Sequence, residues 1–501
     1  MSGDVSAKSP VGAEFATTTV HAPATKHHTG DEDAENRAST SSFARPCPLR
    51  SAPALPAQNS YKTPPATPSL RPFPEVIMSV QLLTMALAPL LGLFIISIGS
   101  ALMSSLTTLR LDAMGFSASM VGIVSSAYFI GLTLGSVFNE RLIVRIGHIR
   151  AYSCFAALIA VTIALQGLSH DPWVWSGLRL VGGWALVGVY LVVESWLLLV
   201  AEPKIRGRLL ALYMIALYGA GLLGQMSLGP VMDAGESVPF TIAAMLASLS
   251  LVPIAMIPRV TPPVERAEPL PAGQLIRITP TGVMGCFGSG VIIAAVYTLL
   301  PLYLQKVGLS VTEVGHTMAA VIFGAMVLQY PVGRWSDRKD RQTVLIVLSA
   351  ACVLLSAITL LLPASGWPML VVMFLLGGGV FAVYPVAVSH AADSAPSGAL
   401  VRMIQGLLLI NSLGSAISPL AISPLMEWAG PSGLFWAFAV LNLALVMFFV
   451  WRRRAHPVPV AAAPFAAATQ YSPTGVELRM TQDLTEAVEA HQAAEQPTPA
   501  H

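Results

Sequence analysis

Two ionisable side chains stand inside one apolar stretch of this sequence, and they are its first candidates for chemistry. Arg179 and Glu194 both fall within residues 173–200, which consist mainly of apolar residues and glycine. An ionisable group at membrane depth costs several kcal/mol and usually serves binding, ion transfer or ion pairing. Fifteen positions separate the two residues, so on a helix they share a face about 22 Å apart and cannot touch. We treat each as a candidate for solute binding or proton coupling.

Both charges also have a structural interpretation, which the sequence leaves open. Arg179 lies about six residues from the start of its apolar stretch, so its side chain could reach the membrane interface instead of a cavity. Glu194 lies about seven residues from the other end and could hydrogen bond to a neighbouring helix.

Polar side chains also occur inside other apolar stretches, where we expect them to face a cavity rather than lipid. The further candidates for substrate contact are Tyr190, Tyr297, Tyr384, Gln225 and Asn411. Tyr190 and Tyr384 are favoured because they occupy matching positions of an internal repeat, although packing tyrosines are the alternative. Pro385 predicts a kink beside Tyr384.

A highly charged segment separates two long apolar stretches. Residues 333–341 carry four cationic and two acidic side chains between the apolar residues 311–332 and 342–363. Such a run cannot lie in hydrocarbon, so it predicts a tight polar turn between two membrane-spanning helices.

The composition is that of a membrane protein. Hydrophobic residues make up 54% and charged residues 11% of the chain, whereas a soluble domain carries about 25% charged residues. No nucleotide-binding loop, dinucleotide fingerprint or zinc-protease motif is visible, and the four cysteines form no disulfide or zinc pattern, so we expect no enzyme activity, cofactor or metal. Twelve candidate spans follow, at roughly 80–107, 117–139, 149–168, 173–200, 208–232, 238–257, 280–304, 311–332, 342–363, 368–391, 399–425 and 432–451.

These spans divide the chain into two halves with polar tails. Residues 1–78 are rich in Ala, Pro, Ser and Thr and are expected to be a disordered tail. Met78 directly precedes the first apolar stretch, which raises the hypothesis that translation starts there. The predicted parts after this tail are a six-helix bundle at 79–257, a proline-rich cytoplasmic linker at 258–279, a second six-helix bundle at 280–454 and a disordered tail at 455–501.

The basic residues in the short loops predict the orientation, because Lys and Arg gather on the cytoplasmic side. Seventeen of them fall on the side of residues 333–341, against Arg110 and Lys306 on the other side. Both termini are therefore expected in the cytoplasm, with the chain in the bacterial inner membrane.

The two halves repeat each other. Residues 114–122 match 307–315 at a shift of 193 positions, and a shift of 194 then aligns Tyr190 with Tyr384. Ser117 and Ser310 are predicted helix N-caps at the starts of spans two and eight. Each half has an even number of spans, so the copies have the same orientation, which predicts a pseudo-twofold axis along the membrane normal. Other aligned pairs are Gly131 with Gly324, Arg141 with Arg334, Arg145 with Arg338, and Gly183 with Gly377.

With this loop, twelve spans and parallel halves, residues 79–454 resemble the major facilitator superfamily, and most of all a bacterial branch whose members mostly lack an assigned substrate. The loop fits the family signature G-x-x-x-D-R-x-x-R through Gly333, Asp337, Arg338 and Arg341. The resemblance implies an all-α fold of two six-helix bundles and a midplane cavity lined mainly by spans one, four, seven and ten. It further implies that Asp337 meets the N-terminus of span five, near Arg206 and Arg208, and closes the cytoplasmic side.

The first half departs from this signature. Arg145 and Gly147 remain, but Glu140 and Val144 stand where the leading glycine and the aspartate belong. The symmetry-related contact with span eleven is therefore in doubt, unless Glu140 or Asn139 takes the place of the aspartate. We expect an asymmetric gate, in which Asp337→Asn cripples transport and Val144→Asp has a mild effect.

Two further motifs bear on mechanism. Arg179 and Gly183 resemble the R-x-x-x-G motif that the family associates with proton transfer. Gly219, Gly221 and Gly224, followed by Gly229, partly resemble an antiporter motif, which favours export, although close helix packing is the alternative.

The sequence thus predicts a monomeric secondary transporter of a small solute, with protons as co-substrate, the lipid bilayer as surroundings and no nucleic-acid partner. The alternatives are a facilitator without proton coupling and a non-transporting membrane sensor on the same scaffold.

Overall fold

The computed structural model describes the backbone of residues 74–200, 206–256, 269–395, 399–455 and 465, and the side chains of these residues except 74–86, 199–200, 206–208 and 401. Within this part of the chain, twelve helices are long and apolar enough to cross a membrane. The predicted all-α architecture of twelve membrane helices is therefore confirmed. The predicted tails lie almost entirely outside the described residues.

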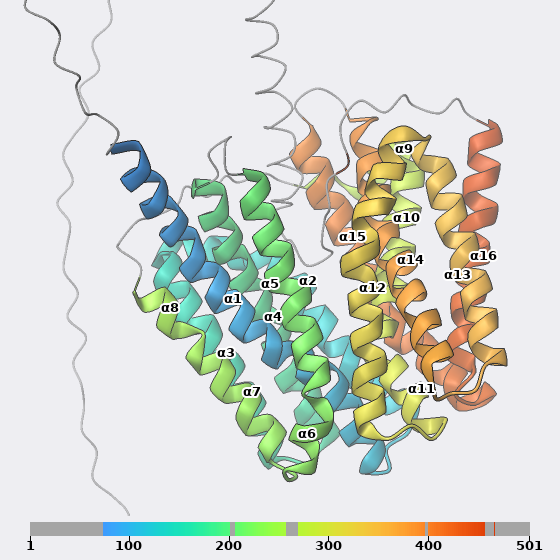
Figure 1. The fold of residues 1–501 in the computed structure, drawn as a ribbon, viewed down its shortest axis with the longest axis horizontal. Coiled ribbons are helices and arrows are strands. Elements are labelled where there is room, and N and C mark those ends of the chain that lie inside the picture. Colours follow the sequence, from blue (N-terminus) through green and yellow to red (C-terminus); the bar gives the residue numbers. More distant parts are fainter. Residues whose placement is uncertain (1–73, 201–205, 257–268, 396–398, 456–464, 466–501) are drawn as a thin grey trace, which may run out of the picture. The chain divides into compact units, whose positions relative to one another are not determined.

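The helices run side by side in two groups (Figure 1). The first half contains α1 (Pro74–Ala113), α2 (Ala118–Ile146), α3 (His148–Leu168), α4 (Pro172–Val200), α5 (Arg206–Met226), α6 (Leu228–Asp233), α7 (Val238–Leu249) and α8 (Leu251–Ala255). The second half contains α9 (Ala272–Ile278), α10 (Pro280–Thr298), α11 (Leu300–Lys306), α12 (Val311–Arg338), α13 (Arg341–Leu361), α14 (Trp367–Ala392), α15 (Leu400–Ala429) and α16 (Gly433–Ala455).

Three spans that the sequence predicts as continuous are each built from two helices. The breaks between α5 and α6, α7 and α8, and α10 and α11 lie just before Pro230, Pro253 and Pro301. A proline ring collides with the carbonyl four residues earlier, so the helix cannot continue unbent. The junction residues Ser227 and Ser250 keep right-handed helical angles, so the chain bends there and continues in the same direction.

Close helix crossings show the predicted repeat in three dimensions. Gly131 of α2 lies so near the carbonyl oxygen of Leu180 in α4 that a Cβ atom would clash with it. The aligned Gly324 of α12 lies in the same way against the carbonyl oxygen of Phe374 in α14. At the same crossings, Gly183 of α4 lies against a backbone oxygen of α2, and Gly377 of α14 lies against a backbone oxygen of α12. The two halves therefore share one backbone geometry, and side-chain volume is excluded at the same points.

The contacts between the halves follow the same symmetry. Gly122 of α2 lies against the backbone oxygen of Pro419 in α15, and the aligned Gly315 of α12 lies against the backbone oxygen of Gln225 in α5. Both glycines stand near the beginnings of their helices, at the end of the structure opposite to the ends of α12 and α16 (Figure 1). We call this the far end, and the end where α12 and α16 finish the cation-rich end.

Polar contacts reinforce the junction at the far end. Lys306 of α11 forms an ion pair with Asp112 of α1 at 2.8 Å. The hydroxyl and backbone N–H of Ser119 in α2 donate to the carboxylate of Glu427 in α15. The two halves are thus joined at the far end by backbone packing and by charge.

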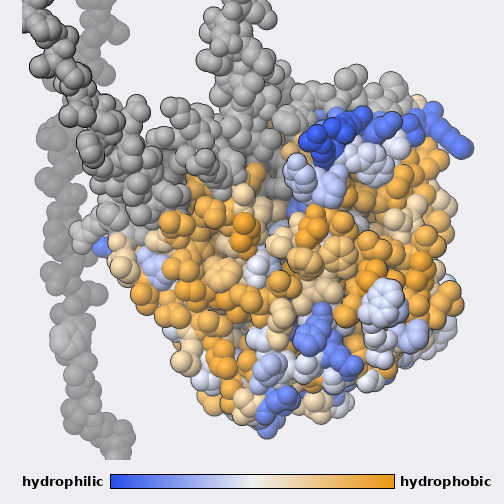
Figure 2. Space-filling view, in the orientation of Figure 1, coloured by the Kyte–Doolittle hydropathy of each residue, from blue (hydrophilic) through white to orange (hydrophobic). Residues whose placement is uncertain are grey.

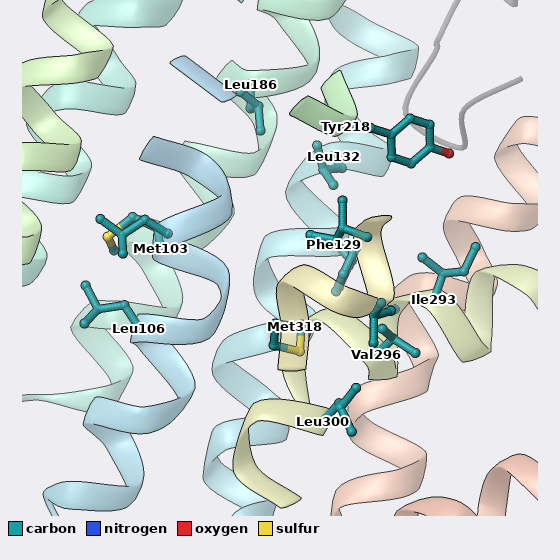
Figure 3. Packing of buried hydrophobic residues seen from close by; sticks show 14 of the residues in the cluster. Met103, Leu106, Phe129, Leu132, Leu186, Tyr218, Ile293, Val296, Leu300 and Met318 are labelled. Carbon is teal, nitrogen blue, oxygen red and sulfur yellow. The ribbon is translucent and has the colours of Figure 1, made fainter. Parts of the chain in front are cut away.

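One cluster of buried apolar side chains continues across this junction. Figure 3 shows Met103 of α1 and Phe129 of α2 in the same cluster as Val296 of α10 and Met318 of α12. A second cluster, which includes Tyr384, lies within the second half. Large apolar residues such as Val161, Met245 and Val440 are exposed on the outside. Figure 2 shows that apolar residues cover much of the visible face of the helices, as contact with a bilayer requires.

The helix caps and one linker segment can be compared with the predictions. Ser117 and Ser310 cap α2 and α12, and Ser310 forms a reciprocal capping box with Glu313, as predicted. Residues 269–278 belong to the segment predicted as a linker. They contain α9, whose Leu275 is fully buried against the second half, because this segment is apolar enough to join its core.

Candidate functional site

A cavity lies between the two halves near the middle of the spans. Its wall comes from α1, α2, α4 and α5 of the first half and from α10 and α14 of the second, and its volume is about 80 Å³. These helices include spans one, four, seven and ten. Its lining includes the polar and aromatic side chains of Ser97, Ser100, Ser104, Tyr128, Phe129, Arg179, Tyr190, Tyr218, Tyr297 and Phe381.

Arg179 forms part of the cavity wall. Its residue is only 6% exposed, and its guanidinium carbon lies 4.7 Å from the centre of the Tyr128 ring. This is cation–π geometry, which offsets part of the cost of burying the charge. Arg179 and Tyr128 also border a smaller hollow lined by Thr162 and Gln166 of α3. The side chain therefore lies inside the protein rather than at the membrane interface.

A row of hydroxyl groups faces Arg179 from α1. Ser97, Ser100 and Ser104 follow one another at intervals of three and four residues, which places them on one face of a helix. Sequence reasoning did not single them out, although this spacing inside an apolar stretch was a readable signal. It also missed Tyr128, whose only signal was a phenol in the interior of span two.

Aromatic rings form a further part of the cavity wall. Tyr190 and Tyr297, both predicted as substrate contacts, line it. Tyr297 and Tyr218 pack edge-to-face on Phe381, with ring centres 5.7 and 6.3 Å from it. Since Tyr218 belongs to the first half and the other two to the second, these rings connect the halves at the level of the cavity.

Two of the predicted contact residues instead tie helices together. The amide of Gln225 accepts a hydrogen bond from Ser105 at 2.7 Å and donates to the backbone oxygen of Ala101 at 2.8 Å, which joins α5 to α1. Asn411 donates to the backbone oxygen of Cys286 at 2.9 Å and joins α15 to α10. A buried amide needs such partners, so these contacts explain both residues without a solute.

Glu194 and Tyr384 are buried outside the set of residues that line the cavity. Glu194 is 0% exposed and accepts a hydrogen bond from the hydroxyl of Tyr213 in α5 at 2.7 Å. It follows Tyr190 by one helical turn, toward the cation-rich end. Tyr384 is 3% exposed and packs in the apolar cluster of the second half.

The charged segment at residues 333–341 is mostly helical, which corrects its interpretation as a loop. Helix α12 continues through Arg338, and only Lys339 and Asp340 separate it from α13. The turn is this short because the Asp340 carboxylate caps α13 by accepting the backbone N–H groups of Gln342 and Thr343.

Arg341 is the centre of a buried ion-pair network at the cation-rich end. Its guanidinium contacts the carboxylate of Asp393 at 2.8 Å and that of Asp337 at 3.8 Å, and it donates to the backbone oxygen of Ser389. The side chains of Arg341 and Asp393 are each 2% exposed. The network fastens the start of α13 to the end of α14, whereas Arg338, also assigned to the gate, is exposed.

Asp337 has a further contact that the sequence did not predict. Its carboxylate accepts the backbone N–H of Phe465 at 2.6 Å, and the Phe465 ring lies against Gly333. The expected partners of Asp337 at the start of span five, Arg206 and Arg208, have side chains outside the described residues.

The matching end of the first half carries a different set of side chains. Val144 and Arg145 are exposed there, and Gly147 adopts a φ of 87° that allows the sharp turn from α2 into α3. His148 occupies the position aligned with Arg341 and is 4% exposed. The two signatures thus differ in residue type, and the asymmetric gate stays a prediction.

Comparisons with known proteins agree with this architecture. The family model described as Major Facilitator Superfamily matches residues 89–407 and 304–484. An uncharacterized MFS-type transporter of Enterobacter sp. (strain 638) is 32% identical over 377 residues, covering 75% of this chain and 97% of that relative. The uncharacterized MFS-type transporter YcaD of Salmonella enteritidis PT4 (strain P125109) is 31% identical over 375 residues, covering 74% and 97%.

Solved structures show the same fold at low identity. The nucleoside transporter NupG matches with a TM-score of 0.62 and 12% identity, covering 74% of this chain and 99% of that one. The D-xylose-proton symporter matches with a TM-score of 0.55 and 15% identity, covering 77% and 99%.

Proposed function

The chain belongs to the Major Facilitator Superfamily and is a membrane transporter, and from that premise we propose that it moves a small solute across the bacterial inner membrane by alternating access, coupled to protons. The observation that carries this proposal is the cavity between the halves, which holds the buried guanidinium of Arg179 among hydroxyl and aromatic groups. A lipid-facing or purely structural arginine would not need these surroundings.

The distribution of charge supports the orientation. The only two basic residues that the sequence places at the far end, Arg110 and Lys306, each form an ion pair, with Glu236 at 3.4 Å and Asp112 at 2.8 Å. Their charges are therefore compensated. The cation-rich end, which carries Arg334, Arg338 and the run Arg452–Arg454, is then the cytoplasmic end, and both termini lie in the cytoplasm.

The contacts between the halves support alternating access. The symmetric glycine contacts and the pair of Asp112 with Lys306 all join the halves at the far end. This conformation is closed toward the outside. Opening requires these contacts to separate while the cytoplasmic ends approach, where Asp337 and Arg341 form the gate of the second half and Arg145 and Gly147 the weaker counterpart of the first.

Glu194 is the proposed proton carrier. It is fully buried, lies one turn from the cavity-lining Tyr190, and its hydrogen bond to Tyr213 joins α4 to α5. Protonation would weaken this bond to the carboxylate and let the two helices shift. The second candidate is a facilitator without proton coupling, in which the hydrogen bond between Tyr213 and Glu194 is a structural contact.

Reconstituted vesicles decide between these two candidates. The wild-type protein should show a proton flux that depends on the solute, with export as the proposed direction, and Glu194→Gln should abolish the proton flux while solute exchange persists. Glu236→Gln is the matched control, because this carboxylate is exposed at the far end. Unchanged proton flux in Glu194→Gln would remove Glu194 from the mechanism and favour the facilitator.

A further inference from the structure

We propose that the central cavity selects small organic anions with a flat or apolar body, and that Arg179 is the counter-charge for their acidic group. The preference for anions follows from the cavity itself. It rests on the proposed function only for the claim that the bound anion is then transported.

The first step of the argument is the charge of the wall. Among the described residues that line the cavity, Arg179 is the one charged side chain. Glu194 is not part of the lining: it lies one turn beyond Tyr190 on the same helix, about 22 Å from Arg179 along the axis, and its carboxylate accepts a hydrogen bond from Tyr213. The charge of Asp112, at the far end, is compensated by Lys306. The lining itself therefore carries a single positive charge, at the position of Arg179.

The second step is the state of the guanidinium. Arg179 is 94% buried by its 6% exposure, and its Nε atom has no hydrogen-bond partner among the described residues. The contact with the Tyr128 ring offsets part of its desolvation but supplies no acceptor for its N–H groups. A planar guanidinium with free donors matches a carboxylate or phosphate, which can accept two parallel hydrogen bonds.

The remaining wall defines the rest of the solute. Ser100 of α1 and the phenols of Tyr190 and Tyr297 add polar groups to the lining. The rings of Tyr218, Tyr297 and Phe381 provide flat apolar surface for stacking. A monoanion with an aromatic or aliphatic body satisfies both regions, whereas an amphiphilic cation would place its charge beside Arg179.

The sign of the cavity can be measured without knowing the solute. In a background where Cys47, Cys154, Cys286 and Cys352 are replaced, Ser100→Cys introduces one thiol into the cavity wall. The reaction rates of this thiol with an anionic and a cationic methanethiosulfonate reagent, each divided by its rate with a free thiol, give a charge-preference ratio. His170→Cys, in an exposed loop, is the reference position.

We expect the ratio at position 100 to favour the anionic reagent about tenfold or more over the ratio at position 170, since a desolvated charge acts strongly at short range. Arg179→Met should remove this preference and Arg179→Lys should keep it. A ratio near that of position 170, or one that favours the cationic reagent, overturns the proposal, and so does an anion preference that survives in Arg179→Met.

Transport gives an independent result. If the protein in reconstituted vesicles transports no solute but the anion preference is present, the transport proposal fails and the anion site stands. If transport occurs and the preference is absent, the anion site fails and the transport proposal stands.

Discussion

At the crossing of α2 and α4 the first half carries Tyr128 and Arg179, whereas the matching crossing of α12 and α14 carries Val321 and Met373. The helix backbones come into contact in the same way at both crossings, because the glycines there have no side chain to keep the helices apart. At the cation-rich end, which is the proposed cytoplasmic gate, the contrast reverses. There the second half holds the buried network of Arg341, and the first half holds His148 at the aligned position.

The difference indicates a division of labour between two copies of one scaffold. Positions where helices touch through their backbones stayed alike, since any added atom would force them apart. Positions beside these contacts were free to diverge. Under the proposed function, the first half carries the groups that meet the solute, and the second half carries the ion pairs that fasten the cytoplasmic gate.

The largest expected effect concerns the stability of the second half. Asp393→Asn leaves the buried charge of Arg341 without its nearest charged partner and should lower the free energy of unfolding by about 3 kcal/mol. His148→Leu should change it by less than about 1 kcal/mol, because the ring nitrogens of His148 have no hydrogen-bond partner among the described residues. Steric trapping of each variant in bicelles measures its free energy of unfolding. Equal losses would mean that the gates are not different in kind.

The next effect concerns the solute site. Arg179→Met replaces the arginine by the residue type found at the aligned position of the second half, Met373. This change should reduce transport about 100-fold, which corresponds to roughly 2.7 kcal/mol. Met373→Leu is the matched control at the aligned position and should transport normally, since this swap conserves volume. Solute flux in vesicles, normalised to folded protein, tests the pair. Normal flux in Arg179→Met would show that the first half is not the binding half.

The gate itself should respond unequally in the two halves. Asp337→Asn removes a charge that contacts Arg341 at 3.8 Å and should lower transport about tenfold. Val144→Asp, at the aligned and exposed position, should change it less than about twofold, because a new surface carboxylate finds little to stabilise it. Similar losses in both variants of the vesicle assay would contradict the asymmetric gate.

The smallest effect concerns what the halves share. Gly315→Ala places a Cβ atom against the backbone oxygen of Gln225 and should disfavour the closed far end by about 1 kcal/mol, or about fivefold in population. Gly177→Ala, where a Cβ meets nothing within 4 Å, is the control. Accessibility of a far-end cysteine to a water-soluble reagent reports the change. Equal accessibility in the two variants would show that the contact between Gly315 and Gln225 does not stabilise the closed far end.

The sequence predicted the features that depend on local pattern. Spans follow from apolar length, caps from Ser117 and Ser310, and the repeat from spacing alone. It could not tell which polar groups meet in space, because that depends on helix rotation and on contacts between distant segments. Gln225 and Asn411 were therefore grouped with Tyr190 and Tyr297, although only the tyrosines line the cavity.

The most direct test of alternating access uses two pairs of spin labels. One pair replaces the aligned and exposed Arg141 and Arg334 at the cytoplasmic end, and the other replaces the exposed Ala113 and Trp428 at the far end. Distances measured by electron paramagnetic resonance should show two conformations of the protein. From one to the other, the distance between the labels at positions 141 and 334 shortens as the distance at the far end lengthens. A single fixed distance at both ends, or changes of the same sign, would contradict the account.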